Sequence, residues 1–380
     1  MRHGSRLAFA AAAMLTVAAC SPGAASSPPG GGAAGSISAK IGAVLSLTKG
    51  AAVYGTSQKN GLELAVKDVN AKGKVSIQLV IEDDASDPQQ GITAFNKLIN
   101  QDNVVAIIGP TLSNTAASTD PIAQQAGVPV LGVSNTAAGI TAIGNFIYRD
   151  SLTEGQVIPQ TIKQAAAKYS LKNVAVIYGQ DDAFTKSGFD VFSKALAANN
   201  ISVVDTETFS KGDKNFSAQL TKIIGLKPDA IVASALANEG TAIVSQARQL
   251  GFTGPIIGGN GFNSPAVIKN GGPAAEGLVV GAAWNSASAS PENQAFLTAY
   301  QAAYGAPPDQ FAAQAYSGVE ILAAAIEAAG KAERDPIRVA LATIKNLPVP
   351  LGSFSFTADR DADHPPVIQI VKNGKFQVLQ

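Results

Sequence analysis

Short apolar segments alternate with amphipathic segments along most of the chain. From Ile41 onward the apolar runs include IGAVLSL, SIQLVIED, VVAIIG and VPVLG, and stretches such as SQKNGLELAVKDVN between them repeat apolar residues at helical spacing. Near-continuous apolar strands between amphipathic helices are typical of a parallel sheet covered on both faces. After about residue 152 the alternation restarts with NVAVIY, ISVVD, PDAIVAS and GPIIGG, which predicts a second α/β lobe.

The two halves share a weak internal repeat of strand, helix, strand and polar loop. VVAIIGP, IAQQAG and VPVLGVSN in the first half parallel PDAIVAS, SQARQLG and GPIIGGN in the second. Ligands of parallel sheets bind beyond the carboxyl ends of the strands, so four loops are candidates. The first loop follows Gly109 and the second contains Ser134 to Thr136. The third follows Ser234 and the fourth contains Asn260. Two lobes that face each other would bring all four loops to one cleft.

The beginning of the chain has a different pattern. Arg2 and Arg6 precede an apolar run that ends at Ala19, as in an export signal, and the run is too short to span a bilayer. Cys20 is the single cysteine of the sequence, so it cannot form a disulfide within the chain. The ending VAAC resembles the lipobox of bacterial lipoproteins, although Cys20 could instead belong to an uncleaved core helix. We expect a signal peptide over 1–19, a lipidated Cys20 that anchors the protein outside the cytoplasm, and a flexible tether over 20–36.

Charge and histidine content narrow the function. Lysine plus arginine and aspartate plus glutamate both number 28, so no net basic field would attract nucleic acid. His364 is the only histidine outside the leader, which removes the commonest general base from nearly the whole chain. The segment DRDADH begins like a calcium loop, but His364 stands at the required glycine. The sequence therefore predicts a small-molecule binder with no cofactor and no metal, and not an enzyme.

Four segments carry a resemblance to a known family. SLTKGAAVYGTSQKNGLELAVKDVNAKG, EDDASDPQQ, VVAIIGPTLSNTAA and GVPVLGVSNTAAGIT together resemble the leucine/isoleucine/valine-binding proteins, which are type I solute-binding proteins of ABC importers. The resemblance implies two lobes joined by a three-strand hinge that close on a ligand. We place the crossovers near residues 152, 284 and 363, with lobe 1 over 37–152 plus 284–362 and lobe 2 over 153–283 plus 363–380. It also implies a monomer that serves ABC permease subunits.

Candidate ligand-binding residues come partly from the residue types and partly from the resemblance. In PTLSNTAAS, the polar side chains from Ser113 to Thr115 can cap a helix whose backbone N–H groups would receive a carboxylate. The resemblance implies that Ser113 and the loop Ser134, Asn135 and Thr136 hold the main-chain polar groups of the ligand. It also implies that Tyr54 lines the side-chain pocket and that Phe184 covers the ligand, although either aromatic could belong to the core.

Three departures limit the resemblance. The first is that Ser86 and Leu112 stand where some members carry a disulfide pair. The other two concern the ligand. Leu236 stands where a ligand-contacting tyrosine is often found, and Asn260 replaces the acid that pairs with the ammonium of an amino acid. Glu239 is near in sequence and could substitute for that acid. We therefore expect a hydrophobic or branched-chain amino acid, or a related small carboxylate, as the ligand. The alternatives are an aromatic acid, a hydroxy acid or an amide, or a sensing module of the same fold that signals to a partner.

Overall fold

A five-stranded parallel sheet organises the first half of the fold. The computed structural model describes residues 35–380, and the predicted signal peptide, Cys20 and nearly all of the predicted tether lie outside them. The strand order is β2-β1-β3-β4-β5. The strands are β1 (Ile37–Leu45), β2 (Val75–Asp83), β3 (Ala106–Ile108), β4 (Val130–Gly132) and β5 (Ile147–Arg149).

A seven-stranded mixed sheet organises the second half, in the order β15-β14-β10-β9-β8-β6-β7. Its first five strands along the chain are parallel, and the last two pair antiparallel at one edge. They are β6 (Asn173–Gly179), β7 (Ser202–Phe209), β8 (Ala230–Ser234), β9 (Ile256–Gly258), β10 (Val279–Ala282), β14 (Val367–Lys372) and β15 (Lys375–Val378). A small antiparallel sheet contains β11 (Leu347–Val349), β12 (Gly352–Phe356) and β13 (Ala362–Asp363).

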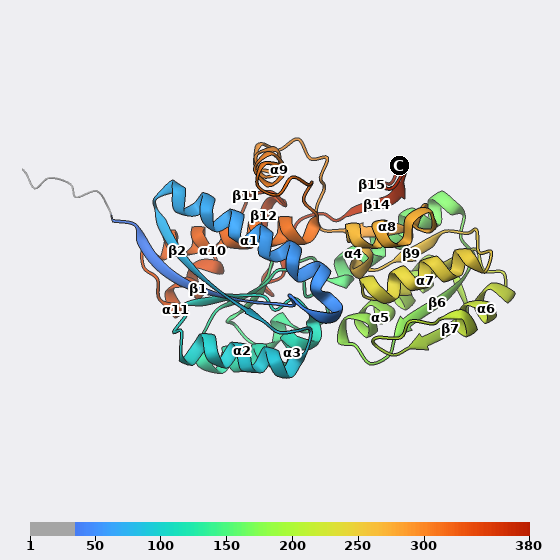
Figure 1. Cartoon of the computed structure of the whole chain (residues 1–380), viewed down its shortest axis with the longest axis horizontal. Coiled ribbons are helices and arrows are strands. Elements are labelled where there is room, and N and C mark those ends of the chain that lie inside the picture. Colours follow the sequence, from blue (N-terminus) through green and yellow to red (C-terminus); the bar gives the residue numbers. More distant parts are fainter. Residues whose placement is uncertain (1–34) are drawn as a thin grey trace, which may run out of the picture. The chain divides into compact units, whose positions relative to one another are not determined.

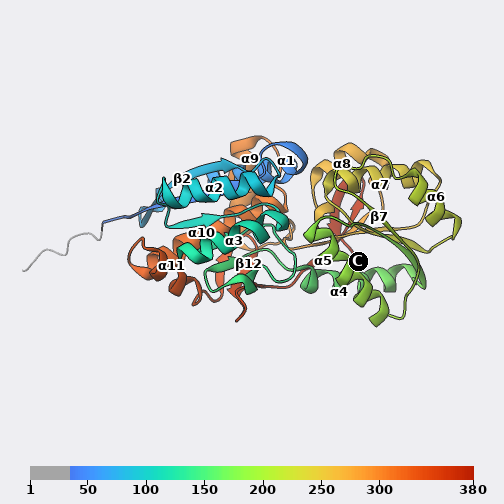
Figure 2. The same cartoon turned by 90° about the horizontal axis from the view of Figure 1, so that it is seen from below.

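Helices cover both faces of each large sheet (Figures 1 and 2). Around the first sheet lie α1 (Ala52–Lys72), α2 (Pro88–Asn100), α3 (Ser113–Ala126), α9 (Pro291–Tyr304), α10 (Gln310–Ala329) and α11 (Arg334–Leu341). Around the second lie α4 (Glu154–Tyr169), α5 (Ala183–Ala198), α6 (Ser217–Gly225), α7 (Ala237–Gln249) and α8 (Pro265–Gly271). We call the first sheet, the small sheet and their helices lobe 1, and the second sheet with its helices lobe 2.

Strand alternation explains why both faces are covered. On β1, Ile41, Ala43 and Leu45 belong to the core beneath α1 and α10, whereas Val44 belongs to the opposite core with α2 and α3. The second sheet is covered in the same way, by α4 and α5 on one face and by α6, α7 and α8 on the other. Successive side chains of a strand point to opposite faces, so a strand that is apolar throughout has to be covered twice.

Local sequence signals set several helix ends. Asp87 accepts hydrogen bonds from the backbone N–H groups of Gln89 and Gln90, and Pro88 stands in the first turn, where its missing N–H has no cost. Thr153 and Gln156 form a reciprocal capping box at the start of α4. The second signal fixes where lobe 2 begins its first helix.

The predicted α/β class, with two lobes built on mostly parallel sheets, is confirmed by this topology. Residues 152 and 284 fall between strands of different sheets and Asp363 is the last residue of β13, just before the chain continues to β14, and the lobe limits at those residues stay a prediction. No helix within residues 35–380 is long and apolar enough to cross a membrane. In the same range no group of three or more histidine, cysteine, aspartate or glutamate side chains is placed to hold a metal ion.

Candidate ligand-binding cleft

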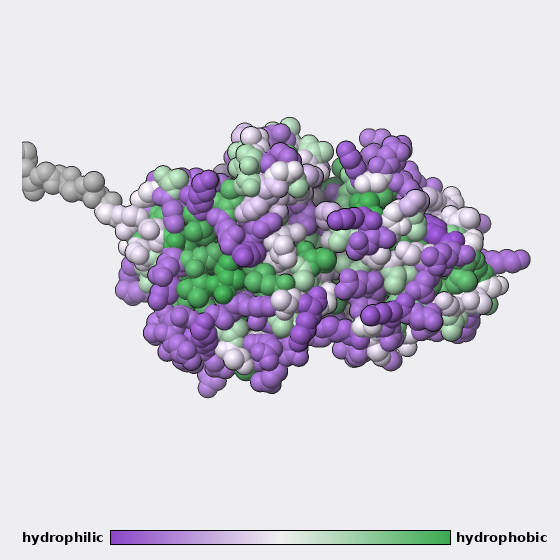
Figure 3. All heavy atoms as spheres, viewed as in Figure 1, coloured by the Kyte–Doolittle hydropathy of each residue, from purple (hydrophilic) through white to green (hydrophobic). Residues whose placement is uncertain are grey.

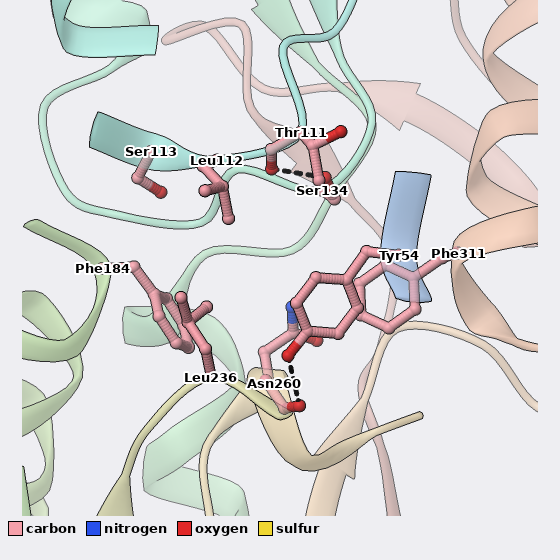
Figure 4. Close-up of a pocket in the computed structure, with 10 residues that line it drawn as sticks. Tyr54, Thr111, Leu112, Ser113, Ser134, Phe184, Leu236, Asn260 and Phe311 are labelled. Carbon is pink, nitrogen blue, oxygen red and sulfur yellow. Dashed lines mark hydrogen bonds between the residues drawn. The ribbon is translucent and has the colours of Figure 1, made fainter. Parts of the chain in front are cut away.

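A cavity lies where the two lobes meet, and all four candidate loops contribute to it (Figure 4). Two helices of lobe 1 and the start of α5 complete its wall. The cavity has a volume of about 20 Å³, which is room for about one water molecule. Its lining residues are Tyr54, Thr111, Leu112, Ser113, Ser134, Phe184, Leu236, Asn260, Gly261 and Phe311.

The start of α3 presents hydrogen-bond donors to this cavity. The first helical bond runs from the Ala116 N–H to the Leu112 carbonyl, so the three preceding N–H groups have no acceptor in the helix. Ser113 Oγ accepts from the Thr136 and Ala137 N–H groups at 3.2 and 3.3 Å. The Ser113 hydroxyl proton has no acceptor among residues 35–380 and is therefore available to a ligand. This end of α3 suits an anion.

The expectation that polar side chains cap α3 is wrong. Leu112 occupies the N-cap position, and no side chain accepts from the first turn. The reason is that Ser113 is already inside the helix, and its hydroxyl holds the loop at Thr136 and Ala137 instead. The missing cap favours ligand binding, because the N–H groups of the first turn of α3 are not bonded to a capping side chain and can donate to a ligand.

Ser134 belongs to a closed network of short hydrogen bonds. Its Oγ donates to the Thr111 carbonyl at 2.6 Å and accepts from Gln58 Nε2 at 2.6 Å. Thr111 Oγ1 in turn donates to Gln58 Oε1 at 2.6 Å. All three side chains are buried. The network fixes the loops after β3 and β4 relative to α1, so this wall of the cavity is preorganised.

Asn135 and Thr136 lie behind the cavity rather than in its lining. Asn135 Nδ2 donates to the Pro110 carbonyl at 3.1 Å, and Thr136 Oγ1 donates to Glu154 Oε1 at 2.8 Å. In this conformation both side chains are thus engaged within the protein. The Thr136 backbone N–H, which donates to Ser113 Oγ, holds the polar loop beside the N-terminus of α3.

Tyr54 connects the two lobes. Its hydroxyl donates to the Gly261 carbonyl at 2.7 Å and accepts from the Ala237 N–H at 2.6 Å, both in lobe 2. Its ring packs against Phe311 at a centroid distance of 4.5 Å. Burial raises the pKa of Tyr54 well above its ordinary value, so the phenol stays protonated and can donate. Across the cavity, Phe184 and Leu236 provide the apolar wall of lobe 2 (Figure 4).

The side-chain orientation of Asn260 follows from its neighbours. Gln310 Oε1 accepts from the Ala283 backbone N–H at 2.6 Å and from Asn263 Nδ2 at 2.9 Å, so Gln310 Nε2 must be the donor on the other side. That nitrogen donates to Asn260 Oδ1 at 2.7 Å. The amide nitrogen of Asn260 therefore keeps two N–H donors without an acceptor among residues 35–380, at a position that lines the cavity.

Glu239 does not take the place of the missing acid. Its Oε1 accepts from the Gly212 N–H at 2.9 Å, and it lines a different cavity beside the loop at residues 211–214. Glu239 is the third residue of α7, which directs it toward that loop rather than toward Asn260. The suggestion from sequence proximity is thus not supported by the geometry.

Glu154 is an acid that the sequence reasoning did not identify. Besides the bond from Thr136, its Oε2 would lie 3.6 Å from a Cβ added at Gly259, which places this carboxylate next to the Asn260 loop. Burial raises the pKa of Glu154 to about 7. In the sequence Glu154 is marked only as the first helical residue after a capping threonine, and acids in the first turn of a helix usually stabilise the helix rather than bind a ligand.

Four lining residues were also missed. Thr111 and Leu112 directly precede Ser113, and Gly261 directly follows Asn260, so the motifs already contained them. Phe311 lies in α10, far from every motif in sequence, and reaches the cavity only because α10 packs on α1. A Cβ added at Gly61 of α1 would lie 2.2 Å from the Ala312 carbonyl, so the two helices touch through their backbones.

Comparisons with known proteins agree with this architecture. The family model described as periplasmic binding protein matches residues 38–375. A Leu/Ile/Val-binding protein, BraC3, from Rhizobium johnstonii is 32% identical over 83% of this chain and 86% of the relative.

Two solved structures are similar over 90% of this chain. The branched-chain amino acid transporter substrate-binding protein from Streptococcus pneumoniae in complex with isoleucine has 29% identity and a TM-score of 0.85, over 98% of that chain. An ABC transporter solute-binding protein from R. palustris in complex with benzoate has 28% identity and a TM-score of 0.83, over 95% of that chain. Relatives of one fold thus hold an amino acid in one case and an aromatic acid in the other.

Proposed function

Because the chain belongs to the periplasmic binding protein family, and within it to the leucine/isoleucine/valine-binding proteins, we propose that it delivers a small carboxylate ligand to an ABC importer. The family consists of solute-binding proteins rather than enzymes. The protein would act outside the cytoplasm, anchored through a lipidated Cys20 and in contact with permease subunits.

The observation that carries the proposal is the start of α3. Three backbone N–H groups and the Ser113 hydroxyl proton converge there without acceptors inside the helix. A carboxylate supplies the acceptor that these donors lack, and the positive end of the helix dipole adds to its stabilisation. Tyr54, Phe184, Leu236 and Phe311 make the opposite part of the wall apolar. The ligand is therefore a small carboxylate with an apolar body.

Asn260 bears on the ligand class. Its free amide donors suit a carbonyl, hydroxyl or carboxylate oxygen, whereas an ammonium needs an acceptor, and the acceptor oxygen of Asn260 is turned toward Gln310 Nε2. This favours an aromatic acid or hydroxy acid as the second candidate beside a hydrophobic amino acid. For an amino acid, Glu154 is the carboxylate that contacts the predicted site, through Thr136.

Binding requires the lobes to move. A cavity of about 20 Å³ cannot admit an amino acid or a benzoate, so the ligand would enter an open form and the lobes would close on it. Tyr54 would then bond lobe 2 as it does in this conformation. Hinge closure of this kind presents a ligand-dependent surface to a permease, or to a signalling partner if the protein is a sensor.

A thermal-shift screen tests the proposal. Leucine, isoleucine, valine, benzoate and hydroxybenzoates are added to the full chain, and a ligand at about 100 times its dissociation constant should add about 2.7 kcal/mol to stability. Ser113→Ala should abolish the shift, because it removes the free hydroxyl donor. Ser118→Ala is the matched control, since Ser118 lies on the same helix and bonds only the Asn114 carbonyl.

The proposal is overturned if none of these acids shifts the unfolding transition, or if Ser113→Ala leaves the shift intact. Uptake of the identified ligand by cells with and without the gene then separates transport from sensing. Lost uptake supports delivery to an importer, and unchanged uptake with altered gene expression supports a sensor.

A further inference from the structure

A second cavity lies between the lobes on the side of the crossover at Trp284. Its volume is about 510 Å³, within the range of cavities that hold small organic molecules. One wall comes from lobe 1, by Leu297 and the segment 307–310, and the other from lobe 2, by the start of α8 and the β14–β15 hairpin. Figure 3 shows the surface hollowed between α9 and the end of that hairpin.

The lining of this cavity is mostly apolar. Trp284 and Phe376 provide aromatic surface, and two aliphatic and three proline side chains add further apolar surface. The apolar members are Pro265, Ile268, Trp284, Leu297, Pro307, Pro308 and Phe376. An apolar cavity of this size between two moving bodies would favour an apolar guest, because the guest removes both surfaces from water.

Polar groups in the cavity lack partners. Gln369 is 6% exposed, and its Oε1 is buried with no hydrogen-bond partner. Lys269 and Lys375 are exposed at the rim and form no ion pair within residues 35–380. The one acid of the lining, Asp309, is already engaged by Ser57 Oγ at 2.7 Å and the Ala312 N–H at 2.9 Å. Two lysines without an ion-pair partner among the described residues are thus available to an anionic group, whereas Gln369 Oε1 is closed off from the cavity.

We propose that this cavity is a second binding site, for an aromatic or aliphatic organic anion. The apolar body lies against Trp284, Ile268 and Phe376. The anionic group meets Lys269 and Lys375, which provide charge-assisted hydrogen-bond donors.

The second site is coupled to the cleft through Gln310. Gln310 lines this cavity, and its Nε2 donates to Asn260 Oδ1, which lines the cleft. A guest that contacts both lobes stabilises the lobe arrangement in which both walls reach it. Its occupancy therefore changes the affinity of the cleft for its ligand, and by linkage the cleft ligand changes the affinity of the second site by the same factor.

The chain carries its own reporter for this test, because Trp284 is the only tryptophan among its 380 residues. The probe is 8-anilinonaphthalene-1-sulfonate, which has an anionic group, an N–H donor and an aromatic body. With the full chain and Trp284 excited, energy transfer to the probe should rise and saturate. The double variant Lys269→Glu/Lys375→Glu should weaken the dissociation constant of the probe at least tenfold.

Two further variants localise the probe. Ser286→Phe places a ring from the exposed rim into the cavity and should also weaken binding at least tenfold. Lys67→Glu changes an exposed lysine of α1 that is remote from both cavities and should leave binding unchanged. Thermal unfolding of each variant checks that it folds. Transfer that does not saturate, or equal probe affinity in all variants, overturns the proposal whether or not the cleft binds an acid.

Discussion

Replacing Asn260 by aspartate tests what the cleft recognises. In the structure Gln310 Nε2 donates to Asn260 Oδ1, and an aspartate oxygen would accept the same bond. The substitution therefore changes only the group that faces the cavity, from two N–H donors to a charged acceptor. An ammonium would gain a charged partner, and a ligand without an ammonium would not.

The size of the effect follows from the hydrogen bond that is gained. Wild-type Asn260 presents only N–H donors to the cavity, so an ammonium gains the whole contribution of a bond to a charged group, about 1.5–3 kcal/mol. Because about 1.4 kcal/mol corresponds to a factor of ten, Asn260→Asp should raise leucine affinity about tenfold to a hundredfold. The comparison ligand is 4-methylpentanoate, which has the leucine skeleton without the ammonium. Calorimetry measures the ratio of the two dissociation constants.

The matched control is Asn285→Asp, which adds the same charge outside the cleft. Asn285 Oδ1 accepts from the Ala287 N–H at 3.0 Å, a bond that a carboxylate keeps. The ratio should not change in this control. If wild type binds leucine tightly and Asn260→Asp leaves the ratio unchanged, the reasoning is refuted and the ammonium is met elsewhere, with Glu154 as the first residue to test.

Four other changes have expected outcomes. Cys20→Ser should release the protein from the membrane fraction into the medium, and continued retention would contradict lipid anchoring. Addition of the confirmed ligand should reduce the radius of gyration measured by small-angle scattering, and an identical radius would indicate a rigid cleft. Tyr54→Phe leaves the Ala237 N–H and the Gly261 carbonyl unpaired only when the lobes are closed, so ligand affinity should fall about tenfold or more in calorimetry, given a cost of about 1–3 kcal/mol for each unpaired group. Glu154 has a folded-state pKa of about 7 against an ordinary 4.5, so it destabilises the fold progressively as pH rises through that interval, by about 3 kcal/mol at most. Urea unfolding across this interval should show a smaller loss of stability for Glu154→Gln, and equal losses would contradict the burial argument.

The fold could be predicted because its signals are local. Apolar runs such as VVAIIG and NVAVIY have no alternating polar residues, so they are not typical of strands with one solvent-exposed face. The capping residue Asp87 marks a helix start within three residues. The antiparallel hairpin β14–β15 was not predicted, since its alternation of apolar and polar residues is short and its pairing depends on β10, which lies far away in the chain.

The site was less predictable because its side chains are oriented by distant partners. Ser134 and Asn260 line the cavity as the motifs suggest. The orientation of the Asn260 amide, however, is set by its bond from Gln310, and the orientation of the Gln310 amide is set by the Ala283 N–H. Thr136 turns toward Glu154, an acid with no motif of its own. Proximity in sequence pointed to Glu239 instead, because sequence alone does not show on which side of α7 a side chain lies.

The polar character of the contacts between the lobes has a consequence for turnover. Asn114 bonds Asp182 Oδ2 at 2.8 Å and the Ala183 N–H at 2.7 Å across the lobes, and the Ala138 N–H bonds Ser187 Oγ at 3.0 Å. Water can replace each of these bonds when the lobes part, so this part of the interface exchanges hydrogen-bond partners, and only the apolar contacts around Tyr54 and Phe311 are lost outright. A receptor closed in this way can hold its ligand in solution and still be opened by modest forces from a membrane partner, which keeps tight capture compatible with rapid release.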